Sequence, residues 1–257
     1  MWNLRSSQGR IQTQEFKFRQ WTVRLERKAF RRSLSIVLKP DGSVCVRANL
    51  KTSDERIHNF LVEKQAWIEK HLNQFEKLRL QFPEKKLLCD EEFPFLGQNL
   101  SLRVVPTLLK KVFFSRQERH LLMHIPQAAW DEMSEEDMQQ FFPQLKQFYQ
   151  RESIRLITER LQIWSVQMEL APRKLKFRNQ KSRWGSCSAQ GIVTMNWRLI
   201  GAPLEVVDYV IIHELAHLQH MNHSKSFWTL VERHCLNLKA CEDWLKNHQM
   251  SLDFLLT

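Results

Sequence analysis

The stretch His213-Glu214-Leu215-Ala216-His217 has the residue types and the spacing that a zinc-dependent hydrolase requires. Residues four apart project from one face of an α-helix, so the His213 and His217 imidazoles can bind a single metal ion. Glu214 lies about 100° around the helix from His213, where its carboxylate can hold a metal-bound water. Zinc lowers the pKa of that water and the carboxylate accepts its proton, which yields a nucleophile near neutral pH. The pattern predicts one Zn²⁺ per chain, with Glu214 as the catalytic base.

Three residues beyond this motif are candidates for the third protein ligand: His220, His223 and Glu232. His220 lies seven residues beyond His213, about 10.5 Å along a straight helix, which is too far for a tetrahedral site. His223 follows Asn222, a residue that tolerates the left-handed conformation in which helices end, so a chain reversal there returns His223 to the metal. We therefore expect His223 to complete a three-histidine site whose fourth position is left to water, and we keep Glu232 as the weaker alternative.

The segment around the motif predicts an amphipathic helix from about Pro203 to Met221. Proline suits the first helical position, and apolar residues recur at helical spacing. The residues expected to form the buried face are Leu204, Ile211, Leu215 and Leu218. Ser224 is expected to cap a following helix, because a serine side chain can accept a hydrogen bond from the first free backbone amides.

A β-hairpin is predicted directly upstream, with strands at 183–188 and 192–197 around the turn signal Gln190-Gly191. If one strand borders the cleft, its backbone can pair with an extended peptide by strand addition. The residues assigned to this substrate-binding role are Trp184, Gly185, Ser186 and Cys187. Trp184 and Trp197 are equally compatible with plain core positions, and Cys187 is interpreted as a small buried hydrophobe.

The first half of the chain predicts mainly β structure. Apolar residues alternate from Trp21 to Ala48, with a turn at Pro40-Asp41-Gly42, and further strands are expected from Phe95 to Val105 and from Val112 to Ile125. Between these strand regions, a helix capped by Ser53 is expected to continue to about residue 77.

The second half of the chain predicts mainly helices. Ser134 is followed by three acidic residues, which predicts a helix that runs to about Val166 with an early break at Pro143. We therefore expect a basic N-terminal segment (1–20), a β-rich region (21–130) and a zincin-like catalytic region (131–257). The predicted fold is α+β, a zincin-like metallopeptidase in which the β-rich half packs on the helix-rich half that carries the zinc helix.

Composition limits the class of protein. Hydrophobic residues make up 43% of the 257 residues, which is typical of a packed globule, and only six glycines argue against an all-β barrel. No apolar run approaches the ~20 residues of a membrane span, and the polar first segment does not resemble a secretory signal, so no membrane partner is expected. Five widely spaced cysteines without a C-x-x-C pair indicate reduced thiols in a cytoplasmic protein and exclude a cysteine-built zinc site.

The formal net charge of +11 is concentrated in the segments 17–32 and 173–183. A solvated basic surface is the ordinary interpretation. The sharper hypothesis is binding of nucleic acid without sequence preference, through phosphate contacts. The residues assigned to this role are Arg31, Arg32, Arg173, Lys174, Lys176, Arg178, Lys181 and Arg183.

Taken together, these motifs resemble the YgjP-like metallopeptidase family, distant relatives of the SprT-like zinc proteases. The resemblance is carried by residues 183–188, 196–200, 209–218, 222–224 and 227–228. It extends more loosely to the turn at 40–42, to Trp67-Ile68 and to Phe95-Leu96-Gly97. It implies a metallopeptidase fold with His223 as the third ligand. Metzincins share the ligand spacing, but His220 stands where they have glycine.

Peptide-bond hydrolysis in a protein or peptide substrate is the leading functional hypothesis. An alternative, suggested by the resemblance to SprT-like proteases, is the processing of proteins attached to DNA. A further alternative is a non-enzymatic, nucleic-acid-binding module with a structural zinc. Glu214 argues against that module, because a structural site has no use for a base and requires a fourth protein ligand.

Overall fold

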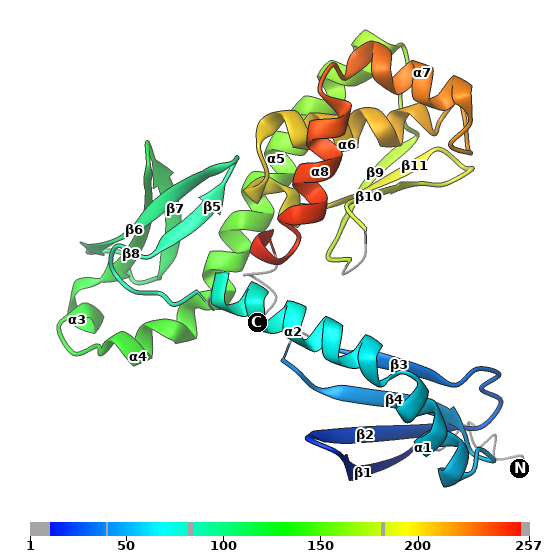
Figure 1. Cartoon of the computed structure of the whole chain (residues 1–257). Coiled ribbons are helices and arrows are strands. Elements are labelled where there is room, and N and C mark those ends of the chain that lie inside the picture. The colour runs from blue at the N-terminus through cyan, green and yellow to red at the C-terminus, as the bar shows by residue number, and fades with distance from the viewer. Residues whose placement is uncertain (1–10, 40, 82–84, 181–182, 253–257) are drawn as a thin grey trace, which may run out of the picture. The chain divides into compact units, whose positions relative to one another are not determined.

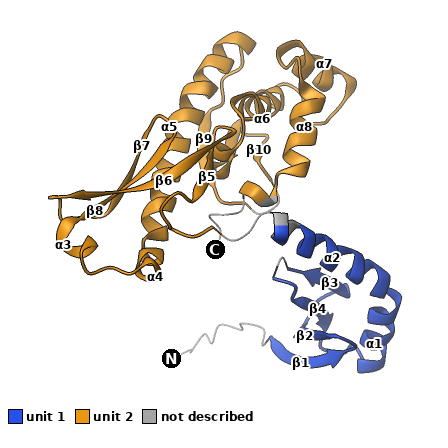
Figure 2. Ribbon diagram, turned by 60° about the vertical axis from the view of Figure 1, so that its left-hand side comes forward, with its two compact units in different colours: residues 1–83 blue, residues 84–257 orange. Residues whose placement is uncertain are grey.

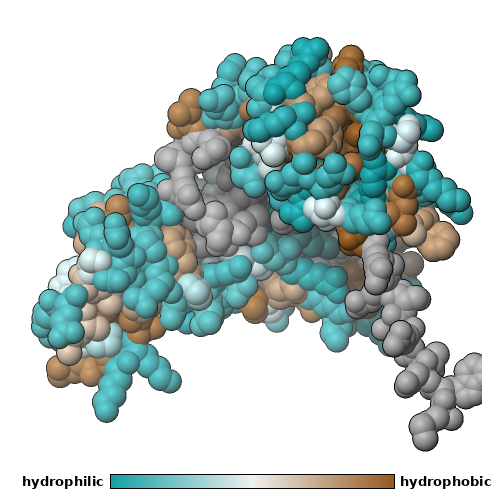
Figure 3. Space-filling model, turned by 90° about the horizontal axis from the view of Figure 1, so that it is seen from below, coloured by the Kyte–Doolittle hydropathy of each residue, from teal (hydrophilic) through white to brown (hydrophobic). Residues whose placement is uncertain are grey.

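The chain is a mixed α/β protein in the computed structural model, which describes residues 11–39, 41–81, 85–180 and 183–252 (Figure 1). Two compact units, residues 1–83 and 84–257, are distinguished in Figure 2. Of the sequence predictions, Pro40, Lys181 and residues 1–10 of the expected N-terminal segment lie outside the described part. Among the described residues, no helix combines the length and the hydropathy needed to cross a membrane. On the face drawn in Figure 3, hydrophilic residues predominate and apolar residues form small, separate patches.

The first unit is a four-stranded sheet with two helices. Its strands, in the order β1-β2-β4-β3, are β1 (Gln12–Phe18), β2 (Trp21–Lys28), β3 (Ser35–Leu38) and β4 (Val44–Asn49). Its helices are α1 (Asp54–Glu63) and α2 (Gln65–Gln81). Alternation along β2 buries Val23 and Leu25 against Ile57 and Leu61 of α1, and Ser53 caps α1 by accepting a hydrogen bond from the Arg56 amide. The predicted strands and the predicted cap are therefore confirmed.

A second four-stranded sheet opens the second unit. Its strands, in the order β5-β6-β8-β7, are β5 (Glu92–Phe95), β6 (Gln98–Thr107), β7 (Phe113–Gln117) and β8 (His120–Pro126). The helices that follow are α3 (Gln127–Trp130), α4 (Glu135–Met138), the 3₁₀ turn η1 (Gln139–Phe141) and α5 (Phe142–Met168). Ser134 and Asp137 form a reciprocal capping box at α4. The predicted early break near Pro143 is confirmed, because the helical run is interrupted at 139–141 and this proline occupies the first turn of α5, where its missing amide costs no hydrogen bond.

The long helix α5 and the second sheet share one hydrophobic core. Phe93 and Phe114 of the sheet and Phe148 and Tyr149 of α5 are all buried in it. The boundary between the compact units, at 83/84, therefore differs from the boundary near residue 130 that composition indicated. The character of the chain does change after β8, as expected. Strands β5 to β8 nevertheless belong with the helices because their apolar residues share a core with α5, while the first sheet buries its apolar residues with those of α1 and α2.

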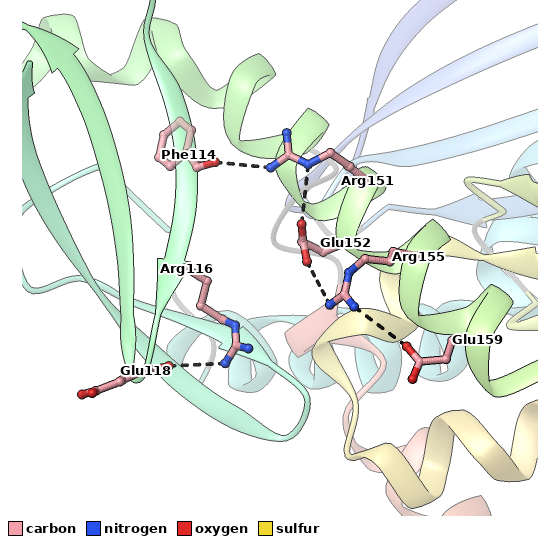
Figure 4. A network of polar contacts seen from close by, with 7 residues as sticks. All are labelled: Phe114, Arg116, Glu118, Arg151, Glu152, Arg155 and Glu159. Atoms are coloured by element: carbon pink, nitrogen blue, oxygen red, sulfur yellow. Dashed lines mark hydrogen bonds and ion pairs between the residues drawn. The ribbon is translucent and has the colours of Figure 1, made fainter. Parts of the chain in front are cut away.

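Polar contacts also join α5 to this sheet (Figure 4). The Arg151 guanidinium donates to the Phe114 carbonyl at 3.4 Å and lies 3.5 Å from Glu152. Arg155 pairs with the same Glu152 at 3.3 Å and lies 3.9 Å from Glu159. The arginine side chains of these pairs are 63% exposed, and such surface pairs contribute about 0–1 kcal/mol each. The buried aromatic core, rather than this network, therefore holds the sheet on the helix.

The remaining elements form the layer that carries the histidine motif. A three-stranded sheet in the order β10-β11-β9 consists of β9 (Lys174–Arg178), β10 (Gly185–Cys187) and β11 (Ile192–Asn196). The helical elements are η2 (Trp197–Gly201), α6 (Leu204–Ala216), α7 (Lys225–His234), α8 (Leu238–Asn247) and η3 (Met250–Leu252). Strand β10 pairs antiparallel with β11, and β9 pairs parallel with β11, so β10 is an edge strand.

Two long-range contacts set the position of α6. Arg160 of α5 donates two hydrogen bonds to the carboxylate of Asp208 on α6. The turn between β5 and β6 docks at the start of α6, where the Leu96 amide donates to the Ile200 carbonyl at 2.7 Å. Gly97 in this turn has φ +75°, and a Cβ there would lie 2.8 Å from Pro203 Cγ. Glycine is needed at this position for both its backbone conformation and its small size.

Candidate metal centre

Helix α6 presents both motif histidines, although it is shorter than predicted. The helix ends at Ala216 rather than near Met221, and His217 is its C-cap residue. Ile211 and Leu215 are fully buried as expected, but Leu204 is 37% exposed because it begins the helix at its outer end. His213 and His217 still lie one turn apart, with ring centroids 5.0 Å from each other.

The chain reverses after α6 in a different way from the one predicted. Asn222 is not among the described residues with positive φ, so the expected left-handed reversal is wrong. The turn instead tightens through bonds from the Leu218 amide to the Leu215 carbonyl (2.9 Å) and from the Gln219 amide to the Ala216 carbonyl (3.1 Å). These three-residue bonds satisfy carbonyls at the helix end, so no left-handed residue is needed. The chain then enters α7 at Ser224, whose hydroxyl accepts from the Phe227 amide at 3.4 Å, as predicted.

This reversal brings His223 to the two helix histidines. The Nε2 atoms of His223 and His213 are 3.2 Å apart, and one ligand nitrogen from each of His213, His217 and His223 lies within 4.8 Å of the others. Nitrogen atoms held tetrahedrally at 2.0–2.1 Å from zinc are separated by about 3.3 Å. The three imidazoles therefore fit a zinc ion with small side-chain adjustments. Among the described residues, His220 and Glu232 fall outside this group.

The three imidazole rings all pack against one aromatic side chain. Phe227 of α7 is fully buried, and its ring centroid lies 4.9 Å from His213, 4.6 Å from His217 and 4.8 Å from His223. Trp228 stacks on the outer side of His223 at 5.6 Å. From sequence, Phe227 was noted only as part of the family resemblance. An apolar residue at a helical position does not reveal that it supports three histidines.

The lowered pKa values of His213 and His217 favour the neutral form that binds a metal ion. Burial, together with neighbouring His217 and His223, lowers the pKa of His213 to about 4, and burial also lowers the pKa of His217. The His217 Nδ1 atom lies 3.0 Å from the His220 carbonyl, a contact that orients the ring and directs Nε2 toward the cluster. Neutral imidazoles with one nitrogen free are the form that binds a metal ion.

Glu214 lies beside the cluster as a buried carboxylate. It is 5% exposed, and burial raises its pKa to about 8, while the nearby Arg183 cation acts in the opposite direction. Its Oε2 atom is buried and has no hydrogen-bond partner among the described residues. Buried polar atoms are nearly always hydrogen-bonded, so this oxygen is suited to a water or substrate group that enters the site.

Gly185 on β10 makes room for the Glu214 side chain. A Cβ added to Gly185 would lie 2.5 Å from Oε1 and 2.6 Å from Cγ of Glu214, closer than real Cβ contacts allow. The edge strand β10 therefore runs directly along the carboxylate, and only glycine permits this approach. The hairpin prediction located this strand, but the strand's contact with Glu214 is a tertiary feature.

Buried polar side chains hold the segment that leads into β10. Asn196 donates from Nδ2 to the Gln180 carbonyl at 2.7 Å and to the Arg183 carbonyl at 2.9 Å. Arg198, which is 2% exposed, also donates to Gln180, and its guanidinium lies 5.0 Å above the Trp184 ring. Their role was not predicted, although both residues lie in a motif that the family resemblance included.

The other residues assigned to the substrate strand differ in their surroundings. Trp184 is partly buried against the core. Trp197 is 3% exposed, so it occupies the core position that was one of its two interpretations from sequence. Burial and the Glu214 carboxylate raise the pKa of Cys187 to about 11, so its thiol stays protonated near neutral pH. This agrees with the prediction that Cys187 is not a nucleophile.

The predicted nucleic-acid residues are divided between the two units. Arg31 and Arg32 lie in the loop after β2, in the first unit. Arg173 and the β9 residues Lys174, Lys176 and Arg178 lie in the second unit, as does Arg183. Along β9 the three basic residues alternate with Leu175 and Phe177, which pack against the core. The two basic segments therefore belong to different compact units.

Comparison with known proteins identifies a family. Residues 32–248 match the family model described as YgjP-like, metallopeptidase domain. No curated protein matches the chain. Among solved structures, the chain is similar to the metallopeptidase zymogen of Pyrococcus abyssi abylysin, with 26% identity over 35% of this chain and 92% of that chain and a TM-score of 0.33.

Proposed function

This chain belongs to the YgjP-like metallopeptidase family, and on that basis we propose that it is a zinc peptidase in which Glu214 is the catalytic base. Family membership supports a peptidase that acts on protein or peptide substrates. The observation that carries the finer proposal is the cluster of three histidine nitrogens beside a buried carboxylate with an unpartnered oxygen.

Three imidazole ligands and a remaining open position are typical of catalytic zinc sites. When bound, the zinc ion supplies Lewis acidity, which lowers the pKa of a water molecule and polarises the substrate carbonyl. His213, His217 and His223 would hold the ion, one per chain. A closed structural site would require a fourth protein ligand, and the described residues offer none next to the three histidines.

In this proposal Glu214 moves the proton. A carboxylate oxygen of Glu214 accepts the proton of the attacking water and passes it to the amine nitrogen that leaves the peptide bond. Burial keeps bulk water away from the carboxylate and restricts its movement, and Gly185 leaves the space that the side chain occupies. A base whose movement is restricted reaches the reactive geometry at a smaller entropic cost.

Strand β10 is proposed to bind the substrate backbone. It is an edge strand, and Gly185 brings it within contact distance of the proposed base. A peptide that adds to its free edge is positioned with a backbone amide near Glu214. Main-chain hydrogen bonds then provide much of the affinity, so side-chain specificity is expected to be broad.

Metal analysis and a base substitution test the proposal together. We expect alanine at His213, His217 or His223 to reduce bound zinc sharply, while Glu232→Ala, a matched change outside the cluster, keeps one zinc per chain. Glu214→Gln should retain zinc and thermal stability but lose about 10²–10⁴-fold in peptidase rate, because the amide cannot accept the proton. Unchanged turnover in Glu214→Gln, or loss of zinc from Glu232→Ala with retention in His223→Ala, would refute these assignments.

One observation favours a second candidate, a peptidase that acts on DNA-bound proteins. The basic side chains of β9, Lys174, Lys176 and Arg178, share a strand face in the same unit as the metal centre. Addition of duplex DNA should then accelerate cleavage of a DNA-binding protein in wild type, but not in a Lys174→Gln/Lys176→Gln variant. Equal cleavage with and without DNA would eliminate this candidate.

A further inference from the structure

The positive charge of the chain is concentrated in its first unit. Residues 1–83 contain 17 Lys and Arg against 8 Asp and Glu, a net charge of +9. Residues 84–257 contain 22 against 20, a net charge of +2. The basic first unit attracts polyanions to a region of the chain that contains none of the proposed zinc ligands.

The loop between β2 and β3 in this unit displays an aromatic ring to solvent. Phe30 is 97% exposed and has φ +61°, a backbone conformation that is unfavourable for a residue with a Cβ. Of the six described non-glycine residues with positive φ, four are polar and Leu96 is half-buried. Phe30 is the one that combines this backbone conformation with an exposed apolar side chain, and no described aromatic ring contacts it.

Basic residues without carboxylate partners among the described residues flank Phe30 in the sequence. Lys28, Arg31 and Arg32 form no ion pair within the described residues, whereas nearby Arg27 is paired with Asp54. Arg31 is fixed by hydrogen bonds from its guanidinium to the Ser33 carbonyl at 2.9 Å and to the Ser35 hydroxyl at 2.8 Å.

The loop backbone is also held in place. The Asn49 side chain on β4 donates to the Arg31 carbonyl at 2.9 Å. The loop therefore presents an exposed ring from a backbone that is held in place, next in sequence to three basic residues without ion-pair partners among the described residues.

We propose that this loop binds single-stranded nucleic acid, with Phe30 stacked on a base and Lys28, Arg31 and Arg32 in contact with phosphates. Every base has a π-face, so stacking on one ring tolerates any sequence. A ring at a loop tip reaches an unpaired base but not a base stacked within a duplex. Binding to a membrane surface usually involves an extended apolar face, and this loop exposes one apolar side chain among basic and polar neighbours.

Binding of the full chain to a fluorescently labelled oligothymidylate of about 16 nucleotides tests the proposal. Phe30→Ala should weaken binding by about five- to 150-fold, the effect of losing one stacked base, while Phe30→Trp retains it. Lys28→Gln/Arg32→Gln should weaken binding and lower the slope of log affinity against log salt by about 1.4.

Two matched variants separate this loop from other exposed features. Leu236→Ala removes an apolar side chain that is 94% exposed in the second unit, and it should leave binding unchanged. Glu214→Gln should also bind normally, because the proposal does not depend on peptidase activity. Phe30→Gly should melt at the wild-type temperature or above, since glycine accepts φ +61° without strain.

Several results would overturn the proposal. Equal affinity of wild type and Phe30→Ala for the oligothymidylate would do so, as would equal affinity of the wild type for a duplex of the same length. A lower melting temperature of Phe30→Gly would assign the ring a structural role instead. Phe30-dependent binding to phosphatidylserine vesicles, without binding to the oligothymidylate, would identify a membrane surface as the ligand.

Discussion

Replacement of Gly185 by alanine is the sharpest test of how the proposed base is positioned. The new Cβ would lie 2.5 Å from Glu214 Oε1, 2.6 Å from Cγ and 2.8 Å from Cδ, whereas ordinary contact begins at 3.4 Å. The clash involves most of the side chain and not its tip alone, so the carboxylate must move away from β10. Because Glu214 is 5% exposed, surrounding atoms restrict where it can go.

The required displacement of Oε1 is about 0.9 Å, and a misplacement of about 1 Å can reduce an enzymatic rate about 10²-fold. At about 1.4 kcal/mol per tenfold change, this corresponds to about 2.7 kcal/mol of lost transition-state stabilisation. Overpacking of this kind also typically costs about 1–3 kcal/mol of stability. Zinc content should stay near one per chain, because the three atoms nearest the added Cβ all belong to Glu214 and none to a proposed ligand.

The assay is hydrolysis of a fluorogenic peptide by zinc-loaded variants below their melting temperatures. Gly42→Ala serves as the control for a glycine substitution without a clash, because an added Cβ at Gly42 has no atom within 4 Å and its cost comes only from the positive φ of that residue. Its activity should equal that of wild type despite some loss of stability. The double variant Gly185→Ala/Glu214→Gln should be no slower than Glu214→Gln alone, since both changes disable the same group. Normal activity in Gly185→Ala, or additive losses in the double variant, would refute the reasoning.

Three further predictions concern the surroundings of the site. Phe227→Ala removes the ring that underlies all three histidines. We expect it to lower the free energy of unfolding by about 3–5 kcal/mol, measured by thermal melting, and the zinc affinity about 10–100-fold, measured by chelator competition. Phe227→Leu should lose less stability and less zinc affinity, and full zinc affinity in Phe227→Ala would contradict this role. Proline substitutions along 185–188, in variants that keep their fold and zinc, should raise the Michaelis constant for extended peptides more than for dipeptides, and indifference at every folded position would exclude strand addition. Asp208→Ala should lower the melting temperature with zinc retained, because the partly buried Arg160 guanidinium loses both acceptors, at a cost of about 1–3 kcal/mol. Asp208→Asn should lose less stability.

Local sequence rules predicted the parts of this protein that depend on neighbours along the chain. Ser53, Ser134 and Ser224 cap helices as expected, because capping needs only a hydroxyl and an amide three residues on. The turn at Gly191 has the positive φ that its residue type indicated. The spacing of His213 and His217 on α6 likewise follows from helical geometry alone.

Tertiary packing decided which residues from distant positions in the chain contact one another. Periodicity indicates that a residue faces the core but not which side chain it meets there, so the Gly185 contact with Glu214 and the support of three histidines by Phe227 could not be read from spacing. Tertiary packing also set the boundary between the two compact units. Composition changes near residue 130, but the chain divides at 83/84 because strands β5 to β8 find their apolar partner in α5, a helix beyond that change. Sequence alone therefore determined the spacing of the proposed metal ligands, because helical geometry is local, and packing determined what surrounds the proposed base.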